Sequence, residues 1–191
     1  NVPGARDIAG LEGTRVELEA AQIEQVLVDR VADRDQRHAV GTLLGRTLTR
    51  ESARELLECF ARHEVRFLVV GGWALAAHGI PRLTKDLDLW IWPEAGNAQR
   101  TLAALDEFGF GGLGLTTQDF QAPDTVIQLG YPPNRVDILT TPTGVDFEPC
   151  WRARLEVDLE GIVVPFIGVE GLIANKRATA RPQDLVDVQS L

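Results

Sequence analysis

The chain of 191 residues is 45% hydrophobic and carries a formal net charge of −9. This length and composition allow one sizeable core, and the negative charge argues against broad, non-specific attraction to nucleic acid, which needs basic patches. No long apolar span suggests a membrane helix, and the N-terminus lacks the order of a signal peptide, so we expect a cytoplasmic protein. The cysteines Cys59 and Cys150 form neither a zinc pattern nor a disulfide framework.

The first part of the chain predicts an appendage followed by one domain. Residues 1 to about 16 show no clear period, and residues 17–33 have a broken helical rhythm of apolar positions. A more regular helix is expected after Thr49, which can cap it, because the apolar residues that follow recur at helical spacing. We therefore divide the chain into an N-terminal arm and helix, 1–48, and a domain, 49–191.

A glycine pair follows the first strand predicted in this domain. The apolar run at 66–70 indicates a buried strand, so Gly71 and Gly72 lie where the strand turns into a helix. The free backbone N–H groups of such a turn can hold phosphate oxygens. A nucleotide is therefore the expected ligand.

Two aspartates begin the next predicted strand. Asp86 and Asp88 share one face of it because side chains alternate with period two, while Leu87, Leu89 and Ile91 occupy the opposite face and are expected in the core. Two carboxylates at one spot repel each other, and a divalent cation relieves that repulsion. Oxygen ligands beside a phosphate site favour Mg²⁺, or Mn²⁺ in its place.

The same strand places two indoles after the acids. Trp90 and Trp92 follow Asp88 on the acidic face, where they could line a pocket for a base or an acceptor. Ordinary packing under a neighbouring helix is the competing interpretation, since aromatic residues dominate cores.

A third acid, Asp137, lies in the short apolar strand expected at 135–139. If this strand lies beside the one that carries Asp86 and Asp88, three carboxylates can hold two cations about 3.5–4 Å apart, as in-line nucleotidyl transfer requires. The alternative is that all three acids simply form the solvent faces of amphipathic strands.

The remaining pattern predicts an α/β (α+β) domain, a mixed sheet with packed helices. A helix is expected at 94–108, ended by Gly109, and the glycine-rich segment 109–114 lacks the lysine and serine of a phosphate loop. A strand at 125–129 should pair with the strand at 135–139. A further hairpin is expected from 155–159 and 162–167, turning at Glu160 and Gly161.

Cations follow in the C-terminal segment 171–187. Lys176, Arg177 and Arg181 could reach a triphosphate or its leaving pyrophosphate, and Lys176 is the preferred candidate. A basic helix end, with Asp184 and Asp187 of the next helix forming ion pairs, explains the same residues equally well. Arg82 and Lys85, nearer the acids in sequence, are as well explained by a solvated entry to the strand as by a substrate clamp.

Taken together, Gly71 and Gly72, the triplet Asp86-Leu-Asp88, and Asp137 resemble the signature of the DNA polymerase beta-like nucleotidyltransferase superfamily. The match covers roughly residues 50–190 and is similar above all to small bacterial members, the minimal nucleotidyltransferases and the toxin-type enzymes of toxin–antitoxin and phage-defence systems. The resemblance implies that Asp86 and Asp88 bind both metals, that Asp137 binds the catalytic metal and accepts the acceptor proton, and that the glycine turn holds the triphosphate. Many members have serine after the first glycine, whereas this chain has Gly72.

The resulting hypothesis is a Mg²⁺-dependent nucleotidyltransferase that moves a nucleoside monophosphate from an NTP such as ATP to a hydroxyl or a phosphate. The acceptor could be a tRNA end, a protein side chain or a small molecule, because fold-level analogy does not choose among them. A cognate antitoxin is an expected partner if the chain is a toxin. The alternatives are a non-catalytic NTP-binding or interaction module of the same fold, and a metal-dependent sugar transferase that uses the Asp-x-Asp triplet.

Overall fold

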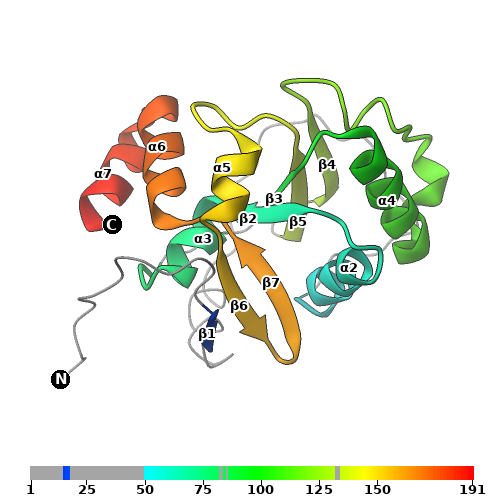
Figure 1. Cartoon of the computed structure of the whole chain (residues 1–191), viewed down its shortest axis with the longest axis horizontal. Coiled ribbons are helices and arrows are strands. Elements are labelled where there is room, and N and C mark those ends of the chain that lie inside the picture. The colour runs from blue at the N-terminus through cyan, green and yellow to red at the C-terminus, as the bar shows by residue number, and fades with distance from the viewer. Residues whose placement is uncertain (1–14, 18–49, 82–83, 85, 132–133) are drawn as a thin grey trace.

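A mixed sheet forms the centre of the protein (Figure 1). The computed structural model describes residues 15–17, 50–81, 84, 86–131 and 134–191. In this part of the chain the sheet has seven strands in the order β1-β6-β7-β2-β3-β5-β4. The strands are β1 (Arg15–Glu17), β2 (Phe67–Val70), β3 (Asp86–Ile91), β4 (Val126–Tyr131), β5 (Asn134–Leu139), β6 (Leu155–Leu159) and β7 (Ile162–Phe166).

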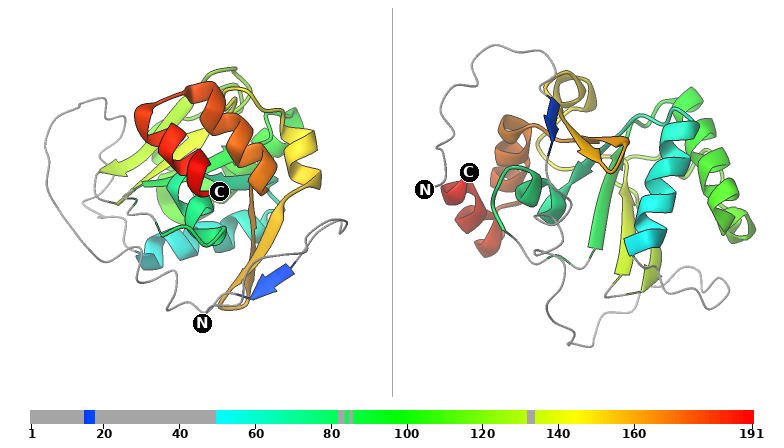
Figure 2. Two further views of the ribbon diagram at one scale, coloured as in Figure 1. Left: turned by 90° about the vertical axis from the view of Figure 1, so that its left-hand side faces the viewer. Right: turned by 90° about the horizontal axis from the view of Figure 1, so that it is seen from below.

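Helices cover both faces of this sheet, which confirms the expected architecture. Figure 2 shows α2 and α4 on one side of the strands, with α3, α6 and α7 on the other. A π-helical turn, η1 (Asp106–Phe110), and a short 3₁₀ turn, η2 (Gly111–Leu113), follow α4. The α-helices are α2 (Arg50–Arg62), α3 (Gly71–Ala77), α4 (Ala95–Leu105), α5 (Phe147–Arg152), α6 (Val169–Thr179) and α7 (Pro182–Ser190).

Strand β2 is the hub of the sheet. All of its residues are apolar and buried, as expected for a strand with neighbours on both edges and layers on both faces. It pairs in parallel with β7 and antiparallel with β3, where Val70 lies opposite Asp88. The buried strand expected at 66–70 is confirmed, and its C-terminal end leads without a loop into α3.

Strands β3 and β5 are parallel neighbours, the arrangement on which the metal-site hypothesis depends. Their register places Asp86 opposite Arg135 and Asp88 opposite Asp137. On the other face of β3, Leu87, Leu89 and Ile91 are buried in the core, as predicted from the period of two.

Both expected hairpins are present. β4 pairs antiparallel with β5, and β6 pairs antiparallel with β7. The second hairpin turns at Glu160 and Gly161, whose φ angles are 53° and 90°. Two residues with positive φ suit the right-handed twist of a two-residue hairpin, which explains why glycine stands at the second position.

The helix expected at 94–108 is divided at its C-terminal end. Its α-helical part stops at Leu105 and continues as η1, in which Gly109 has a φ of 105°. At its start, the Glu94 side chain accepts hydrogen bonds from the backbone N–H groups of Gly96 and Asn97. This cap satisfies donors that have no partner inside the helix.

Most of the expected N-terminal arm and helix, and the Thr49 cap, lie outside the described residues. Arg15 and Val16 were expected in a loose arm and Glu17 at the start of a helix, but Arg15–Glu17 forms β1 and pairs in parallel with β6. A strand edge offers unpaired backbone groups, so a short segment can add to it without a strong pattern of its own. Among the described residues no helix has the length and apolar character needed to cross a membrane.

Candidate functional site

The acids singled out in the sequence lie on neighbouring strands. Asp86 and Asp88 are half-buried on one face of β3, and Asp137 is buried on β5 directly beside Asp88 in the register. Parallel pairing sets this arrangement, because it aligns residues of the same parity on the same face of the sheet. The strand neighbourhood assumed for the metal hypothesis is therefore present.

Arg135, which sequence analysis did not assign to the site, bonds to two of these acids. The Arg135 guanidinium donates from Nη2 to Asp86 Oδ2 at 2.8 Å and to Asp137 Oδ2 at 2.9 Å. Its Nε also lies 2.7 Å from Asp137 Oδ1. The signal for this contact was in the sequence, since Arg135 is two residues before Asp137 and so shares its face of β5.

Asp88, one of the three acids, has a clearly shifted pKa. Burial, reinforced by the negative charges of Asp137 and Asp86, raises its pKa from 3.8 to about 7, against the opposing influence of Arg135 and Arg181. Desolvation and like charges both disfavour the ionised form of this carboxyl. Near neutral pH, a proton or a bound cation would relieve that cost.

Gly71 is pressed against this carboxyl. Its φ is +66°, and a Cβ placed on it would lie 2.1 Å from Asp88 Oδ2, far inside contact distance. A Cβ on Gly72 would lie 2.6 Å from Cβ of Thr84. A side chain on either glycine would therefore displace its neighbour, and the backbone angle of Gly71 also favours glycine. The strand-to-helix junction and the acid of β3 are in direct contact.

The junction itself has the character expected of a phosphate-holding turn. Val70 precedes α3 in an extended conformation, and no side chain caps the start of the helix. Whether the amides of Gly71 and Gly72 bind phosphate stays a prediction, supported by their position beside Asp88.

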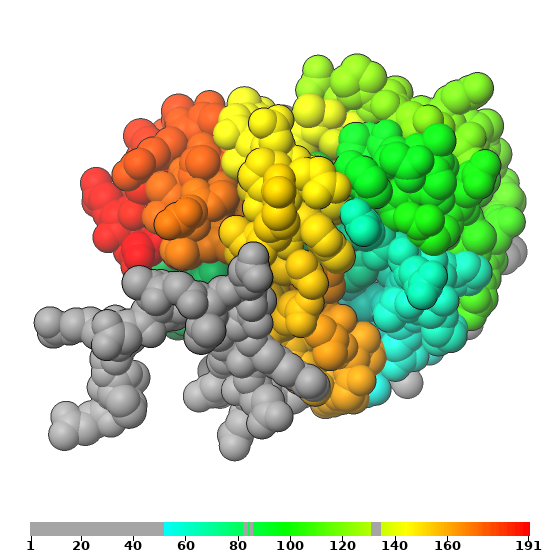
Figure 3. Space-filling view, viewed as in Figure 1, coloured from blue at the N-terminus to red at the C-terminus, as the bar shows by residue number. Residues whose placement is uncertain are grey.

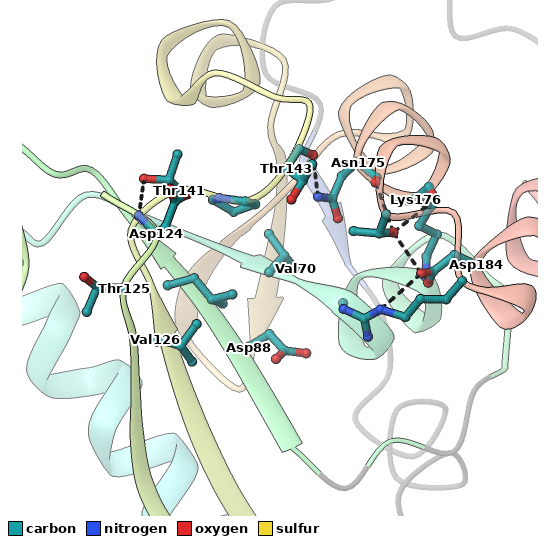
Figure 4. Close-up of a pocket in the computed structure, with 15 residues that line it drawn as sticks. Val70, Asp88, Asp124, Thr125, Val126, Thr141, Thr143, Asn175, Lys176 and Asp184 are labelled. Atoms are coloured by element: carbon teal, nitrogen blue, oxygen red, sulfur yellow. Dashed lines mark hydrogen bonds and ion pairs between the residues drawn. The ribbon is translucent and has the colours of Figure 1, made fainter. Parts of the chain in front are cut away.

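A cavity of about 340 Å³ opens in front of Asp88 (Figure 4). Gly71 and Asp88 form one wall, and residues of α6 and α7 form another. Asp124, Thr141 and Val126 line the side away from α6, whereas Thr143 lies beside Asn175, whose side-chain amide donates to its carbonyl (Figure 4). The cavity thus joins the glycine junction, an acid and cationic side chains in one space.

Lys176, the predicted phosphate cation, lines this cavity but its ammonium is engaged. It donates to Asp184 Oδ1 at 3.0 Å and to Asp187 Oδ2 at 2.8 Å, and its side chain is only 7% exposed. These bonds join α6 to α7 across the turn at Ala180, which has a φ of 51°. The ion pairs with Asp184 and Asp187 that sequence analysis offered as the alternative are thus present, while the nucleotide-binding role of Lys176 stays a prediction.

Arg181 is the more accessible cation of the same cavity. Its side chain is 76% exposed and lies 3.7 Å from Asp184 Oδ2, a loose contact. Its charge reaches Asp88, whose pKa it lowers. Arg177, the third cation of this segment, is exposed on α6 and is not among the residues that line the cavity. Arg82 and Lys85 lie outside the described residues.

A second cavity, of about 640 Å³, shares a wall with the first. Asp124 and the segment 141–143 line both spaces, and the second continues between α5 and α6. The segments that enclose it lie side by side on the face shown in Figure 3, in yellow and orange. Its wall includes the carboxylates of Asp146 and Glu170.

Trp90, in β3, and Trp92, directly after it, pack against other side chains. Trp90 is buried, meets Phe147 edge to face and donates from Nε1 to the carbonyl of Thr140. Trp92 stacks on Phe147 and carries the Arg66 guanidinium 4.9 Å from its ring centroid. Neither lines the two cavities. Of the two interpretations, core packing is the one this geometry supports, because α5 covers the acidic face beyond Asp88.

The donor chemistry of the site fits a hard divalent cation. Asp86, Asp88 and Asp137 are oxygen ligands on one face, and their mutual repulsion is the kind that such an ion relieves. As the side chains stand, however, no group of three or more His, Cys, Asp or Glu residues in the described part of the chain is gathered closely enough to hold an ion. Arg135 takes up oxygens of two of the three acids in this arrangement.

No protein-family model and no curated protein matches the chain. The fold is similar to that of the crystal structure of a "putative nucleotidyltransferase (TM1012)" from Thermotoga maritima. The TM-score is 0.51 at 15% sequence identity, and the match covers 73% of this chain and 89% of that one. This similarity establishes the class of fold: the chain has a nucleotidyltransferase fold.

Proposed function

We propose that the protein is a Mg²⁺-dependent nucleotidyltransferase, which moves a nucleoside monophosphate from an NTP to a hydroxyl or phosphate acceptor. One observation carries the proposal: Asp88 lies between Asp137, its register partner on the parallel strand β5, and Gly71, whose backbone touches its carboxylate. An acid cluster and a glycine junction in contact unite a cation site with a phosphate site, which is the combination that phosphoryl chemistry needs.

Each residue has a defined part in the proposed reaction. Asp86, Asp88 and Asp137 would hold Mg²⁺ or Mn²⁺, which supplies charge stabilisation for the phosphates. The amides of Gly71 and Gly72 hold phosphate oxygens. The acceptor oxygen bonds to the α-phosphorus, the bond from that phosphorus to its bridging oxygen breaks, and pyrophosphate leaves. Asp137 takes the proton of the acceptor.

Arg181 supports the phosphate end of this proposal. Its guanidinium lies at the rim of the cavity that Gly71 and Asp88 line, and it is held only loosely by Asp184. A planar guanidinium can bind two phosphate oxygens at once. We assign Arg181 the contact to the triphosphate, and Lys176 contributes by fixing the turn from which Arg181 extends.

The second cavity supplies room for the acceptor. It shares Asp124 and the segment 141–143 with the cavity at Asp88, so a group bound there lies beside the reacting phosphate. The acceptor remains a tRNA end, a protein side chain or a small molecule. The toxin–antitoxin or defence role, with an antitoxin partner, rests on the resemblance of the chain to toxin-type enzymes.

The test is transfer from labelled nucleotide. The protein is incubated with each α-³²P-labelled NTP and Mg²⁺, alone and with total tRNA, cell protein or small alcohols, and label is followed into each acceptor. We expect transfer, and we expect Asp88→Asn to reduce it by at least about a hundredfold, as loss of a transition-state ligand does. The matched control is Glu55→Gln, an exposed acid of α2 on the opposite face, which should keep full activity.

The alternatives give different results in the same assay. NTP binding by the wild type without any transfer would indicate an interaction module and refute the enzymatic proposal. Consumption of a labelled nucleotide-sugar, with NTPs left intact, would indicate the sugar transferase. Equal transfer by the wild type and Asp88→Asn would remove Asp88 from the site.

A further inference from the structure

The contact between Arg135 and the acids is a built feature of the site. Arg135 lies opposite Asp86 in the β3–β5 register, and it is two residues before Asp137 on its own strand. Its side chain is only 22% exposed, and its guanidinium bonds to both acids at 2.8 and 2.9 Å. One cation therefore bridges acids from two strands in the interior of the site.

The bridge compensates for charge crowding. Adjacent carboxylates in a partly buried site repel each other, and removal of a paired cation from such a site leaves uncompensated buried charge. Arg135 lies on β5 with Asp137, so its charge is present whenever the protein is folded. No free energy is spent on binding a cation from solution. Arg135 thus performs, in the metal-free protein, the neutralising task that a divalent ion would perform.

We propose that Arg135 is a tethered counter-ion that occupies the cation position between Asp86 and Asp137, and that a divalent ion enters by displacing it from these carboxylates. The inference rests on the proposed function, since it takes the three acids as the metal ligands. It adds that a divalent ion must compete with Arg135 for the carboxylates of Asp86 and Asp137.

The oxygens of Asp137 explain why the two cations compete. Oδ2 accepts a hydrogen bond from Arg135 Nη2, and Oδ1 lies 2.7 Å from Nε of the same side chain, although without the alignment of a hydrogen bond. A Mg²⁺ ion needs such oxygens at about 2.0–2.1 Å in a near-octahedral arrangement. With both oxygens facing the guanidinium, the acids are not gathered around an ion in this arrangement, and a shift of Arg135 would free them.

The experiment measures Mn²⁺ binding, without nucleotide, to the metal-free full chain, from the electron paramagnetic resonance signal of free Mn²⁺. We expect Arg135→Gln to bind Mn²⁺ about tenfold more tightly than the wild type, because the competing charge is gone. Arg135→Lys keeps the charge but loses the fork that holds two carboxylates, so its affinity should fall between the two. Arg181→Gln is the matched control, because Arg181 lines the same cavity and influences Asp88, while its ion pair is with Asp184.

Thermal melting provides the second readout. Metal-free Arg135→Gln should melt below the wild type, since the acids lose their counter-ion, and saturating Mn²⁺ should raise its Tm by more than it raises that of the wild type. A variant that folds only with Mn²⁺ would also support displacement, since the ion would then replace the missing charge.

The outcomes separate this inference from the proposed function. Equal or weaker Mn²⁺ binding by Arg135→Gln, or an equal gain in Arg181→Gln, would overturn the displacement of Arg135 and leave the metal site standing. No Mn²⁺ binding in the wild type, in Arg135→Gln or in Arg135→Lys would overturn the metal site itself, and the proposed function with it.

Discussion

Replacement of Asp88 by asparagine should stabilise the metal-free protein, and the gain should grow with pH. In the wild type the pKa of this carboxyl is raised from 3.8 to about 7, chiefly by burial. The folded state therefore binds its proton more tightly than the unfolded state, and stability is lost as pH rises from about 4 to about 7. Each pH unit in that window costs about 1.4 kcal/mol, so the full penalty is about 4 kcal/mol.

Asparagine has nearly the shape of the protonated acid and carries no charge, so Asp88→Asn escapes this penalty. The difference in unfolding free energy between variant and wild type should increase by about 2–3 kcal/mol between pH 5 and pH 8, where most of the window lies. Urea denaturation in the presence of EDTA, followed by circular dichroism at several pH values, measures it. Glu55→Gln, the exposed control on α2, should change stability by no more than about 0.5 kcal/mol at either pH.

Divalent ions should reverse the order of stability of the wild type and Asp88→Asn. Saturating Mg²⁺ stabilises only the protein that can bind it, so the wild type should gain and Asp88→Asn should not. A stability difference that stays constant from pH 5 to pH 8 would refute the reasoning, because it would mean that Asp88 is ionised at equal cost in both states.

Two further changes test the glycine junction and the α6–α7 turn. Gly71→Ala should destabilise the protein well beyond Gly114→Ala, because Gly114 has a similar φ of +69° but open space around it. Thermal unfolding of the two variants therefore separates the contact with Asp88 from the backbone strain of about 1 kcal/mol that both share. Equal losses of stability would contradict the close contact. Lys176→Met should cost about 3–5 kcal/mol because it removes the buried cation that bonds to Asp184 and Asp187, whereas Arg181→Gln should leave Tm nearly unchanged and raise the Kd for NTP in a titration. The opposite pattern would return the phosphate contact to Lys176.

Strand positions were predictable because local pattern determined them. The continuous apolar run of β2 fits a strand buried on both faces, and the alternation from Leu87 to Ile91 placed Asp86 and Asp88 on one face. The hairpin at Glu160 and Gly161 was predictable from its turn residues. The strand order was a different matter, because the pairing of β3 with β5 joins segments about fifty residues apart and depended on the resemblance.

The contacts of charged side chains were harder to predict. The face of Arg135 follows from the same alternation that gave the acids, but its partners Asp86 and Asp137 could be named only once the register was known. Ion pairs of the basic cluster with Asp184 and Asp187 were predicted only as one of two alternatives, because they depend on a reversal of the chain at Ala180, which has a positive φ that its residue type does not suggest. Sequence patterns give periodicity along an element, whereas these contacts depend on how two elements meet.

The same limit applies to Trp90. Its parity placed it correctly on the acidic face, and parity alone offered it to a ligand. The structure buries it because Phe147, more than fifty residues later, covers that face just beyond Asp88. One face of one strand therefore belongs to the site at its beginning and to the core at its end.

The absence of space between Gly71 and Asp88 has a thermodynamic consequence. A ligand that holds the backbone at Gly71 also restrains the carboxylate beside it, and an ion on that carboxylate restrains the backbone in return. Under the proposed function, nucleotide and cation would then be linked ligands, and reciprocity requires that each raise the affinity of the other by the same factor.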